Sequence, residues 1–388
     1  MKIRIQTSSM NDYILYLGLL LFIAANFLGI TFYSAYLSGL VVHATMILSV
    51  GLLAFREIVL SKFTLNTVVT CLIIASLSML VIFSSGGFSN YVYMLLVIFF
   101  LRNSNFKQIV RFVLPLITAL LLFTVVSSKL GIILDYVEVT PTRVRHYLGF
   151  RYSLFPSTMM LHITALTIYL KGASITYRRL TVLLLSVSWI FMQTNSRLTF
   201  ISSLVLLLLG LSMKLFPKIL VKVRGLLFLL IPSYIYAPLL SYFMVMRYPY
   251  LDSSILTLNR FLGERIYLAY KSLSIYGFSW IGQKIPWVGN GLDPFGNRNT
   301  SSSYLYVDNM YIQILQRYGF IFLGILIILL TLLLTYLYSR KQYLLMTILI
   351  LLAFHAAIDD LMFVLHYNIF WLLLFLPFSD DLTLLEEE

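Results

Sequence analysis

An uncharged and almost wholly apolar stretch decides the fold class of this chain: Tyr318-Gly-Phe-Ile-Phe-Leu-Gly-Ile-Leu-Ile-Ile-Leu-Leu-Thr-Leu-Leu-Leu-Thr-Tyr-Leu-Tyr338. A helix needs about 20 predominantly apolar residues to cross the hydrocarbon core of a bilayer. The stretch reaches that length, so it predicts a transmembrane helix. Charged residues return only outside it, with Arg317 before it and Arg340 after it.

The composition of the whole chain agrees with this stretch. Of 388 residues, 60% are hydrophobic and only 11% are charged, and the mean hydropathy is +0.91. Soluble domains have about 45–50% apolar and about 25% charged residues. The composition therefore excludes a soluble enzyme, a disordered chain, collagen and a coiled coil. The single cysteine, Cys71, excludes an intramolecular disulfide and a cysteine-rich metal site.

Apolar segments recur along the chain and predict an all-α polytopic membrane protein with about twelve transmembrane helices. They are centred on residues 13–33, 36–55, 65–84, 88–101, 109–128, 156–170, 180–194, 197–213, 225–245, 318–338, 342–358 and 363–378. The first segment is too long for a cleaved signal peptide, so we expect it to be retained.

Successive short loops of this topology alternate between a high and a low content of basic residues. One set of loops is rich in lysine and arginine, whereas the opposite short loops have almost none. The positive-inside rule then places both termini in the cytoplasm of a multi-pass cell-membrane protein. This rule also accounts for the net charge of +13, so we expect no nucleic-acid partner. The basic set is Lys2, Arg4, Arg56, Lys62, Arg102, Lys107, Arg111, Lys171, Arg178, Arg179, Lys214, Lys218, Lys222, Arg224, Arg340 and Lys341.

Two longer segments lie on the opposite, extracytoplasmic side. Residues 1–245 are expected to contain nine spans and a smaller outer loop at 127–155. Residues 246–317 form one large outer loop, and residues 318–388 contain three spans and a cytoplasmic tail. Apolar residues at helical spacing predict a short helix over Leu258–Ser274 within the large loop. A loop of this length in a compact protein is usually functional. No inverted repeat is visible, which argues against a secondary transporter.

Asp308, near the end of the large loop, is a candidate with two readings. It can be the N-cap of the helix that follows, or a general base that takes a proton from a hydroxyl. The two roles do not exclude each other. Tyr311 lies on the same face of the expected helix and is a candidate for substrate binding.

Arg197 is the second candidate, at the outer end of a span and against the charge bias. It can extend its guanidinium to the interface, or bind an anion such as pyrophosphate through its fork of donors. Cations of the outer loops are candidates for the same cluster, and two acid–base residues near the eleventh span, His355 and Asp359, form a second tier. The further substrate-binding candidates are Arg143, Arg145, His146, Arg151, Arg260, Arg265 and Arg317.

No sequence motif indicates a bound cofactor. The chain has no P-loop, no G-x-G-x-x-G and no H-E-x-x-H. The adjacent pair Asp359-Asp360 has too few oxygen ligands to form a metal site by itself. We therefore predict no metal, no nucleotide and no other cofactor.

The topology and three short stretches resemble the Wzy-type polysaccharide polymerases, which are related to the O-antigen ligases. Arg145-His-Tyr-Leu-Gly-Phe150 resembles the Arg-x-x-x-Gly-Phe stretch of this family, and Asn195-Ser-Arg-Leu-Thr199 resembles its Ser-Arg segment. Tyr306-Val-Asp-Asn-Met-Tyr-Ile-Gln-Ile-Leu-Gln-Arg-Tyr-Gly319 resembles its Asp-Asn-x-Tyr…Gly motif. The chain departs from the family at Arg151-Tyr-Ser-Leu154, where members often have His-Pro-Asn, and the ligases often have His where Asp308 stands.

The resemblance implies a metal-independent glycosyltransferase that makes O-antigen or capsule polymers at the cell envelope. The donor is a growing glycan on polyprenyl (undecaprenyl) pyrophosphate, and the acceptor is a hydroxyl of the next lipid-linked repeat unit. Outer-face arginines would bind the pyrophosphate and Asp308 would deprotonate the acceptor. A flippase and a chain-length regulator are the implied partners. Two alternatives remain: a flippase for the same lipid-linked oligosaccharide, and a ligase-like transferase.

Overall fold

The computed structural model describes residues 7–60, 64–141, 143–298 and 303–379. The predicted cytoplasmic charges Lys2, Arg4 and Lys62 lie outside these residues, as does most of the predicted tail. Helices dominate the described part, and a two-stranded hairpin is the sheet within it.

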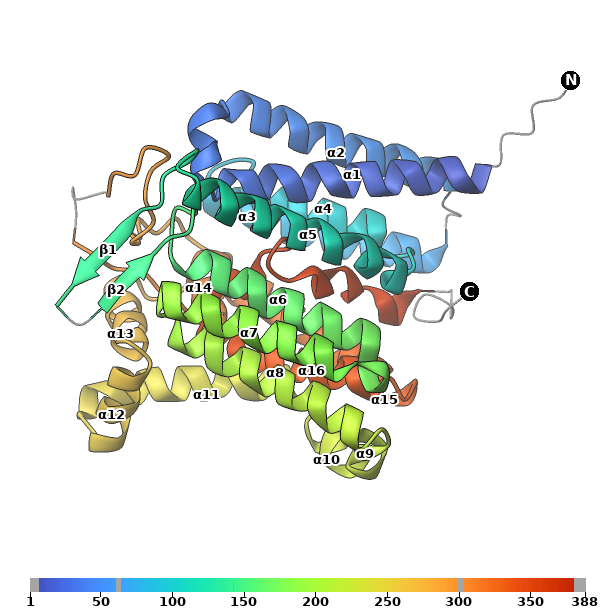
Figure 1. Cartoon of the computed structure of the whole chain (residues 1–388). Coiled ribbons are helices and arrows are strands. Elements are labelled where there is room, and N and C mark those ends of the chain that lie inside the picture. The colour runs from blue at the N-terminus through green and yellow to red at the C-terminus, as the bar shows by residue number, and fades with distance from the viewer. Residues whose placement is uncertain (1–6, 61–63, 142, 299–302, 380–388) are drawn as a thin grey trace, which may run out of the picture.

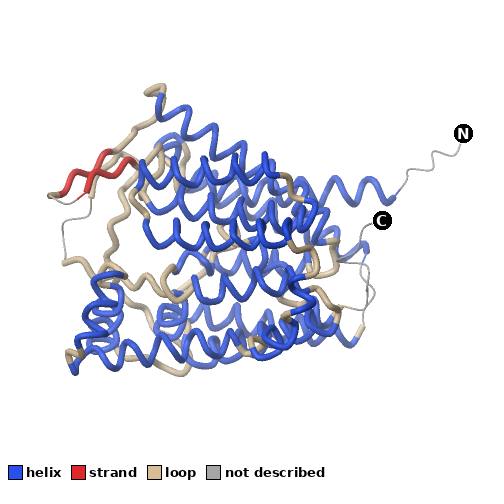
Figure 2. The backbone as a smooth tube through the Cα atoms, turned by 60° about the horizontal axis from the view of Figure 1, so that its bottom comes forward, coloured by secondary structure: helices blue, strands red, loops and turns tan. Residues whose placement is uncertain are grey.

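The long helices pack side by side in one bundle (Figures 1 and 2). The start of α1 and the last described turn lie at one end of it. The hairpin, α12 and α13 lie at the other end (Figure 1). The helices of the bundle are α1 (Thr7–Gly29), α2 (Gly39–Leu60), α3 (Leu65–Ser85), α4 (Asn90–Leu101), α5 (Phe106–Lys129), α6 (Leu154–Lys171), α7 (Tyr177–Thr194), α8 (Arg197–Leu215), α9 (Ile219–Lys222), α10 (Arg224–Leu229), α11 (Ser233–Arg247), α15 (Gly319–Ser339) and α16 (Tyr343–His355).

Six of these helices, α1, α2, α3, α5, α8 and α15, are long and apolar enough to cross a membrane. Shorter apolar helices cover 90–101 and 343–355, and a third apolar segment covers 369–378. The outer faces of the bundle carry large apolar side chains; on α2, for example, Leu40 and Ile58 are 81% and 79% exposed. Such faces suit contact with lipid rather than water. The structure thus agrees with a helical membrane protein, while the expected twelve spans are not confirmed.

Two of the predicted spans have a different form. The segment 225–245 is not one helix, because a turn that contains Pro232 separates α10 from α11. The segment 363–378 is not an α-helix at all: it consists of short 3-10 turns, including η5 (Ile369–Leu373) and η6 (Leu376–Phe378).

Backbone groups in and beside the 363–378 segment form hydrogen bonds to side chains, in place of the bonds that an α-helix would form. The Asn368 amide and the Trp371 indole both donate to the carbonyl of Met362, at 3.0 and 2.7 Å. The Ile369 amide donates to the His162 ring of α6 at 3.0 Å. Irregular backbone is tolerated at membrane depth where protein satisfies it in this way. Hydropathy alone does not reveal these partners.

The outer end of the bundle carries short elements from the two outer loops. The strands β1 (Val137–Thr140) and β2 (Arg143–His146) pair antiparallel, so that Glu138 lies opposite Arg145. The large loop contains η3 (Tyr248–Tyr250), α12 (Ser253–Phe261), α13 (Arg265–Tyr276) and α14 (Met310–Arg317). After α16 the chain forms η4 (Asp360–Phe363); the remaining 3-10 turns are η1 (Phe32–Tyr36) and η2 (Gly172–Ser174).

A close backbone contact fixes the large loop to the junction of α14 and α15. Gln283 donates to the carbonyl of Arg317 at 3.0 Å, and Phe320 donates to that of Ser279 at 3.0 Å. Gly282 and Gly319 both have positive φ angles, of 89° and 92°. A Cβ atom on either glycine would collide with the backbone around the other. Glycine is therefore required at both positions.

Replacing Gly319 with alanine should destabilise the protein strongly. The left-handed conformation alone costs a side chain roughly 1–2 kcal/mol, and the backbone collision adds to that cost. We expect a fall of several degrees in the apparent melting temperature in detergent. Gly324→Ala is the matched control on the same helix, since a Cβ atom there meets open space. Equal melting temperatures for the two variants would contradict the expected strain.

Candidate functional site

Asp308 lies two residues before the start of α14, but it is not the cap of that helix. Asn309 is the N-cap: its side-chain oxygen accepts from the amide of Ile312 at 3.1 Å, and its side-chain NH2 donates to the carbonyl of Ala357 at 2.7 Å. The N-cap reading of Asp308 is therefore wrong. Its carboxylate is left to form an ion pair with Arg265, with Nε and Oδ2 3.3 Å apart.

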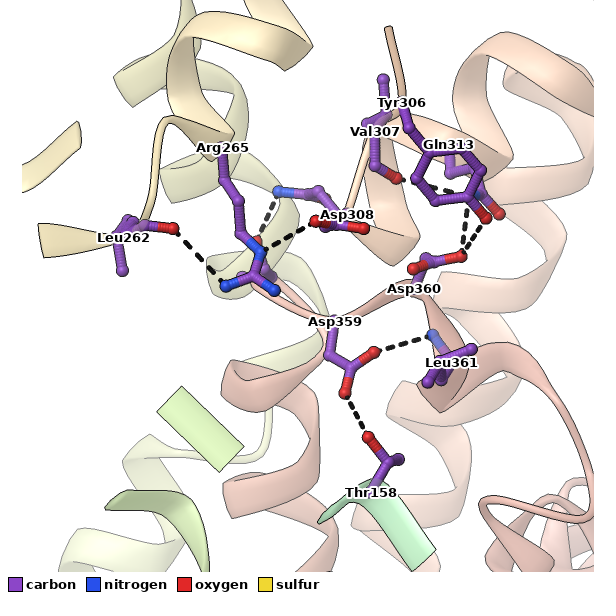
Figure 3. A network of polar contacts seen from close by, with 12 residues as sticks. Thr158, Leu262, Arg265, Tyr306, Val307, Asp308, Gln313, Asp359, Asp360 and Leu361 are labelled. Carbon is purple, nitrogen blue, oxygen red and sulfur yellow. Dashed lines mark hydrogen bonds and ion pairs between the residues drawn. The ribbon is translucent and has the colours of Figure 1, made fainter. Parts of the chain in front are cut away.

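A break in the predicted loop helix positions Arg265. The expected single helix over Leu258–Ser274 is wrong, because α12 and α13 are separated at Gly263 and Glu264, which both have positive φ angles. Asn259 stabilises the break: it donates to the Glu264 carboxylate at 2.6 Å and accepts from the amide of Tyr267 at 3.0 Å. Arg265 is consequently the first residue of α13, and its side chain points toward Asp308 (Figure 3).

Two further carboxylates lie beside this ion pair (Figure 3). Asp360 accepts from the Tyr306 hydroxyl at 2.7 Å and from the Gln313 amide at 2.9 Å. Asp359 accepts from the amide of Leu361 and from the hydroxyl of Thr158, both at 3.0 Å. Asp359 is also 3.3 Å from Nε2 of His355, whose Nδ1 is 2.8 Å from the Ser202 hydroxyl.

Burial raises the pKa of Asp308 above its ordinary value; the Arg265 guanidinium works against this effect and the Asp359 carboxylate adds to it. Burial also raises the pKa of Asp360, to about 7, and the charges of Asp308 and Asp359 raise it further. Close carboxylates in a buried site cannot all be ionised cheaply. The cluster can therefore hold and release a proton near neutral pH, as acid–base chemistry requires.

The raised pKa of Asp360 predicts a pH-dependent stability. An unfolded aspartate loses its proton near pH 4, whereas folded Asp360 keeps it up to about pH 7. Between these values only the folded state binds the proton, so the contribution of Asp360 to stability falls as pH rises and is constant above about pH 7. Asp360→Asn removes this term. The apparent melting temperature of this variant minus that of the wild type should increase between pH 4 and pH 7. A difference that stays constant over this range would contradict the raised pKa of Asp360.

Two cavities meet at Asp308. The acid cavity, of about 400 Å³, is lined by Tyr152, Tyr304, Tyr306, Asp308 and Asp360 among others. The cation cavity, of about 500 Å³, is enclosed by β2, the start of α8 and the break between α12 and α13. Five residues line both cavities, and they are Tyr152, Leu154, Asn290, Tyr304 and Asp308.

The cation cavity concentrates positive charge. Its lining includes Arg143, Arg145, Arg197, Arg265 and Lys271, against the acids Glu264 and Asp308. Burial lowers the pKa of Arg143, and the nearby charges of Arg145 and Arg197 lower it further. These cations therefore repel one another, and a bound anion would relieve that repulsion.

Arg197 and Arg145 differ in how they are held. Arg197 begins α8 and is exposed; within the described ranges no hydrogen bond or ion pair involves its side chain. Arg145 donates from Nε to the carbonyl of Thr194 at 2.9 Å, and its Nη1 is 3.6 Å from the Glu138 carboxylate. Arg145 is thus a fixed cation, whereas the donors of Arg197 remain available to a ligand.

The structure leaves several predicted site residues away from both cavities. Arg260 is exposed at the end of α12, and His146 pairs with Asp135 at 3.4 Å. Tyr311 is buried and donates its hydroxyl to the carbonyl of Ala353 at 2.7 Å. The guanidinium of Arg317 lies over the Trp287 ring, 5.1 Å from its centroid. These four residues support the site or stand apart from it; they do not line it.

Three other predicted residues have indirect positions. Arg151 lines the acid cavity, but its guanidinium binds the carbonyls of Leu292 and Gly29, at 2.7 and 3.2 Å. It therefore fastens the large loop to the end of α1. His355 and Asp359 are buried and line neither cavity, but they pack behind Asp360 and complete the polar network.

Sequence reasoning missed several residues of the site. Asp360, Tyr304 and Tyr306 line the acid cavity, and Lys271 lines the cation cavity. The tyrosines alternate along the segment that leads to Asp308, which is a signal for side chains on one face. Asp360 directly follows the second-tier candidate Asp359 in the sequence, and that neighbour is the signal that could have found it. Among the described residues, no group of three or more His, Cys, Asp or Glu side chains could hold a metal ion.

The fold agrees with a helical membrane protein, and the candidate site consists of two polar, partly buried cavities that meet at Asp308. No protein-family model matches the chain, and neither a curated protein nor a solved structure matches it.

Proposed function

We propose that the protein is a polysaccharide polymerase, a glycosyltransferase that joins oligosaccharide repeat units carried on polyprenyl pyrophosphate. One observation carries the proposal: a cavity rich in arginine and a cavity that holds the carboxyl groups of Asp308 and Asp360 share Asp308 in their common wall. Glycosyl transfer from a pyrophosphate needs both environments at one carbon atom, because an anion leaves from one side and a hydroxyl attacks from the other.

The reaction follows from this arrangement. The acceptor hydroxyl gives its proton to the Asp308 carboxylate while its oxygen forms a bond to the anomeric carbon of the donor. The bond between that carbon and the phosphate oxygen breaks, and its electron pair leaves with the pyrophosphate. Arg197, Arg145 and Arg265 stabilise the charge that develops on the leaving group. A base whose pKa is raised toward neutrality is well suited to the proton transfer.

The surroundings of the site suit the same substrates. Apolar helices offer lipid-facing walls along which a polyprenyl chain can lie. The basic loops favour cytoplasmic termini. The hairpin, α12 and α13, which contribute residues to the cation cavity, lie at the end of the bundle opposite the start of α1 (Figure 1). The cavities would then open to the outer face of the cell membrane, where a flippase delivers repeat units and a chain-length regulator could bind.

A deletion in the native host tests the proposal, with analysis of lipid-linked glycans and of their sidedness. We expect loss of polymer and accumulation of single lipid-linked repeats on the outer face, restored by the wild-type gene. Single repeats held on the cytoplasmic face would identify a flippase instead. Polymer that is made but not passed to its final anchor would identify a ligase. Either of these results would overturn the polymerase proposal.

A further inference from the structure

A third cavity, of about 460 Å³, adjoins the acid cavity at Ile30. We call it the α1–α2 cavity, because residues of α1, α2 and the connection between them form most of its wall. The start of α4, Pro294 and the irregular segment 364–366 complete it. The function proposed above does not use this cavity.

The α1–α2 cavity differs from the cation cavity in charge. Asn26, Ser34, His43, Asn90 and His366 supply its polar side chains, and no Asp, Glu, Lys or Arg is among the described residues that line it. Phosphate is therefore an unsuitable occupant. Neutral donors and acceptors beside the ring of Tyr91 suit an uncharged, hydroxyl-bearing ligand.

One polar group of this wall lacks a partner. The His366 side chain is only 4% exposed, and neither of its ring nitrogens has a hydrogen-bond partner among the described residues. An unsatisfied buried imidazole is costly. Asn26 and Ser34, by contrast, donate to the carbonyls of Phe22 and Thr31, at 2.9 and 2.7 Å. Both ring nitrogens of His366 are closed off from the cavity, so the polar side chains that a ligand there can reach are instead those of His43 and Asn90, which are exposed.

The α1–α2 cavity lies next to the acid cavity, because the same chain segments line both. Ile30 lines both this cavity and the acid cavity. Leu292 and Leu361 line the acid cavity, and Pro294 and Val364, a few residues further along each segment, line the α1–α2 cavity. The three cavities thus follow one another, with cations at one end, carboxyl groups in the middle and neutral polar groups at the other end.

We propose that the α1–α2 cavity binds uncharged sugar rings of the acceptor repeat unit. This inference rests on the proposed function. The donor pyrophosphate would occupy the cation cavity, the reacting hydroxyl would lie beside Asp308, and the rest of the acceptor saccharide would extend past Ile30 into the α1–α2 cavity.

Three glycines allow a matched test. Gly29 and Gly39 line the α1–α2 cavity, whereas Gly51, further along α2, does not. A Cβ atom at any of the three meets nothing within 4 Å. Phenylalanine at position 29 or 39 therefore starts from an unobstructed Cβ at the wall of the cavity, and Gly51→Phe adds the same ring to an exposed position of α2.

The measurement is the affinity of the purified protein for two probes, the lipid-linked repeat extracted from the host and polyprenyl pyrophosphate without sugar. We expect Gly29→Phe and Gly39→Phe to weaken binding of the repeat at least tenfold and to leave the sugar-free probe within twofold. Gly51→Phe should match the wild type for both probes. Wild-type affinity for the repeat in the two cavity variants would overturn the proposal.

A smaller change guards against misfolding of the phenylalanine variants. His43 is exposed on the rim of the cavity, so His43→Ala removes one polar contact without disturbing packing. We expect a loss of about fivefold in affinity for the repeat, the value of one hydrogen bond; no loss would overturn the proposal. Both assays measure binding. A deletion strain that keeps its polymer would refute the proposed function. The binding affinities of the cavity variants test the saccharide site independently of that result.

Discussion

Asp308→Asn should reduce polymer formation in a complemented deletion strain by a factor of 10² to 10⁴, the usual contribution of a general base. Asparagine keeps the shape of the side chain but cannot take a proton from the acceptor hydroxyl. It also leaves Arg265 without its ion-pair partner, which is 3.3 Å away in the wild type. The measurement is the amount of polymer per molecule of protein in the membrane.

Asp252→Asn is the matched control for this variant. Asp252 belongs to the same outer loop and caps α12 by accepting from the amide of Ser254 at 2.9 Å, a bond that asparagine can also accept. It lines none of the three cavities, so its polymer yield should remain at the wild-type level. A yield from Asp308→Asn equal to that of this control would remove Asp308 from the mechanism.

Arg197→Ala should weaken use of the donor by about 10- to 100-fold, because a hydrogen bond to a charged group contributes roughly 1.5–3 kcal/mol. Arg197 is exposed and lines the cation cavity, so its loss should not destabilise the bundle. The effect should appear as a raised KM for the lipid-linked donor. Arg197→Lys should recover part of it, since an ammonium group keeps the charge but not the planar fork of donors.

Arg260→Ala is the control for the arginine prediction. Arg260 is also exposed and belongs to the same outer surface, but it lies outside the cation cavity. A general loss of positive charge would affect both variants equally, whereas a specific anion site would affect only Arg197→Ala. Equal KM values for the two variants would argue for the first explanation and against the site.

The sequence predicted the helical membrane class because apolar length is a property of each segment alone. It did not predict the irregular form of 363–378, since the side chains that satisfy this backbone come from elsewhere: His162 belongs to α6, in a distant part of the chain. Pro232 was visible in the sequence, and it marks the break within 225–245 that the apolar pattern conceals.

The sequence predicted which residues belong to the candidate site, but it did not predict which of them form ion pairs with one another. Arg145, Arg197, Arg265 and Asp308 were all candidates, and all four line the cation cavity. The ion pair between Arg265 and Asp308 depends on the left-handed turn at Gly263 and Glu264. The periodic pattern of apolar residues does not predict this turn. Arg260, only five positions from Arg265, could not be separated from it by composition, yet the turn leaves it outside the cavity.

The irregular segment 363–378 has a consequence for the biogenesis of the protein. Its backbone is completed by side chains, including the ring of His162 in α6, and amides without partners are costly inside a bilayer. The segment can therefore reach its native form only after α6 is already in the membrane and packed. The segment thus follows α6 both in synthesis and in folding, and it settles against helices that have been inserted before it.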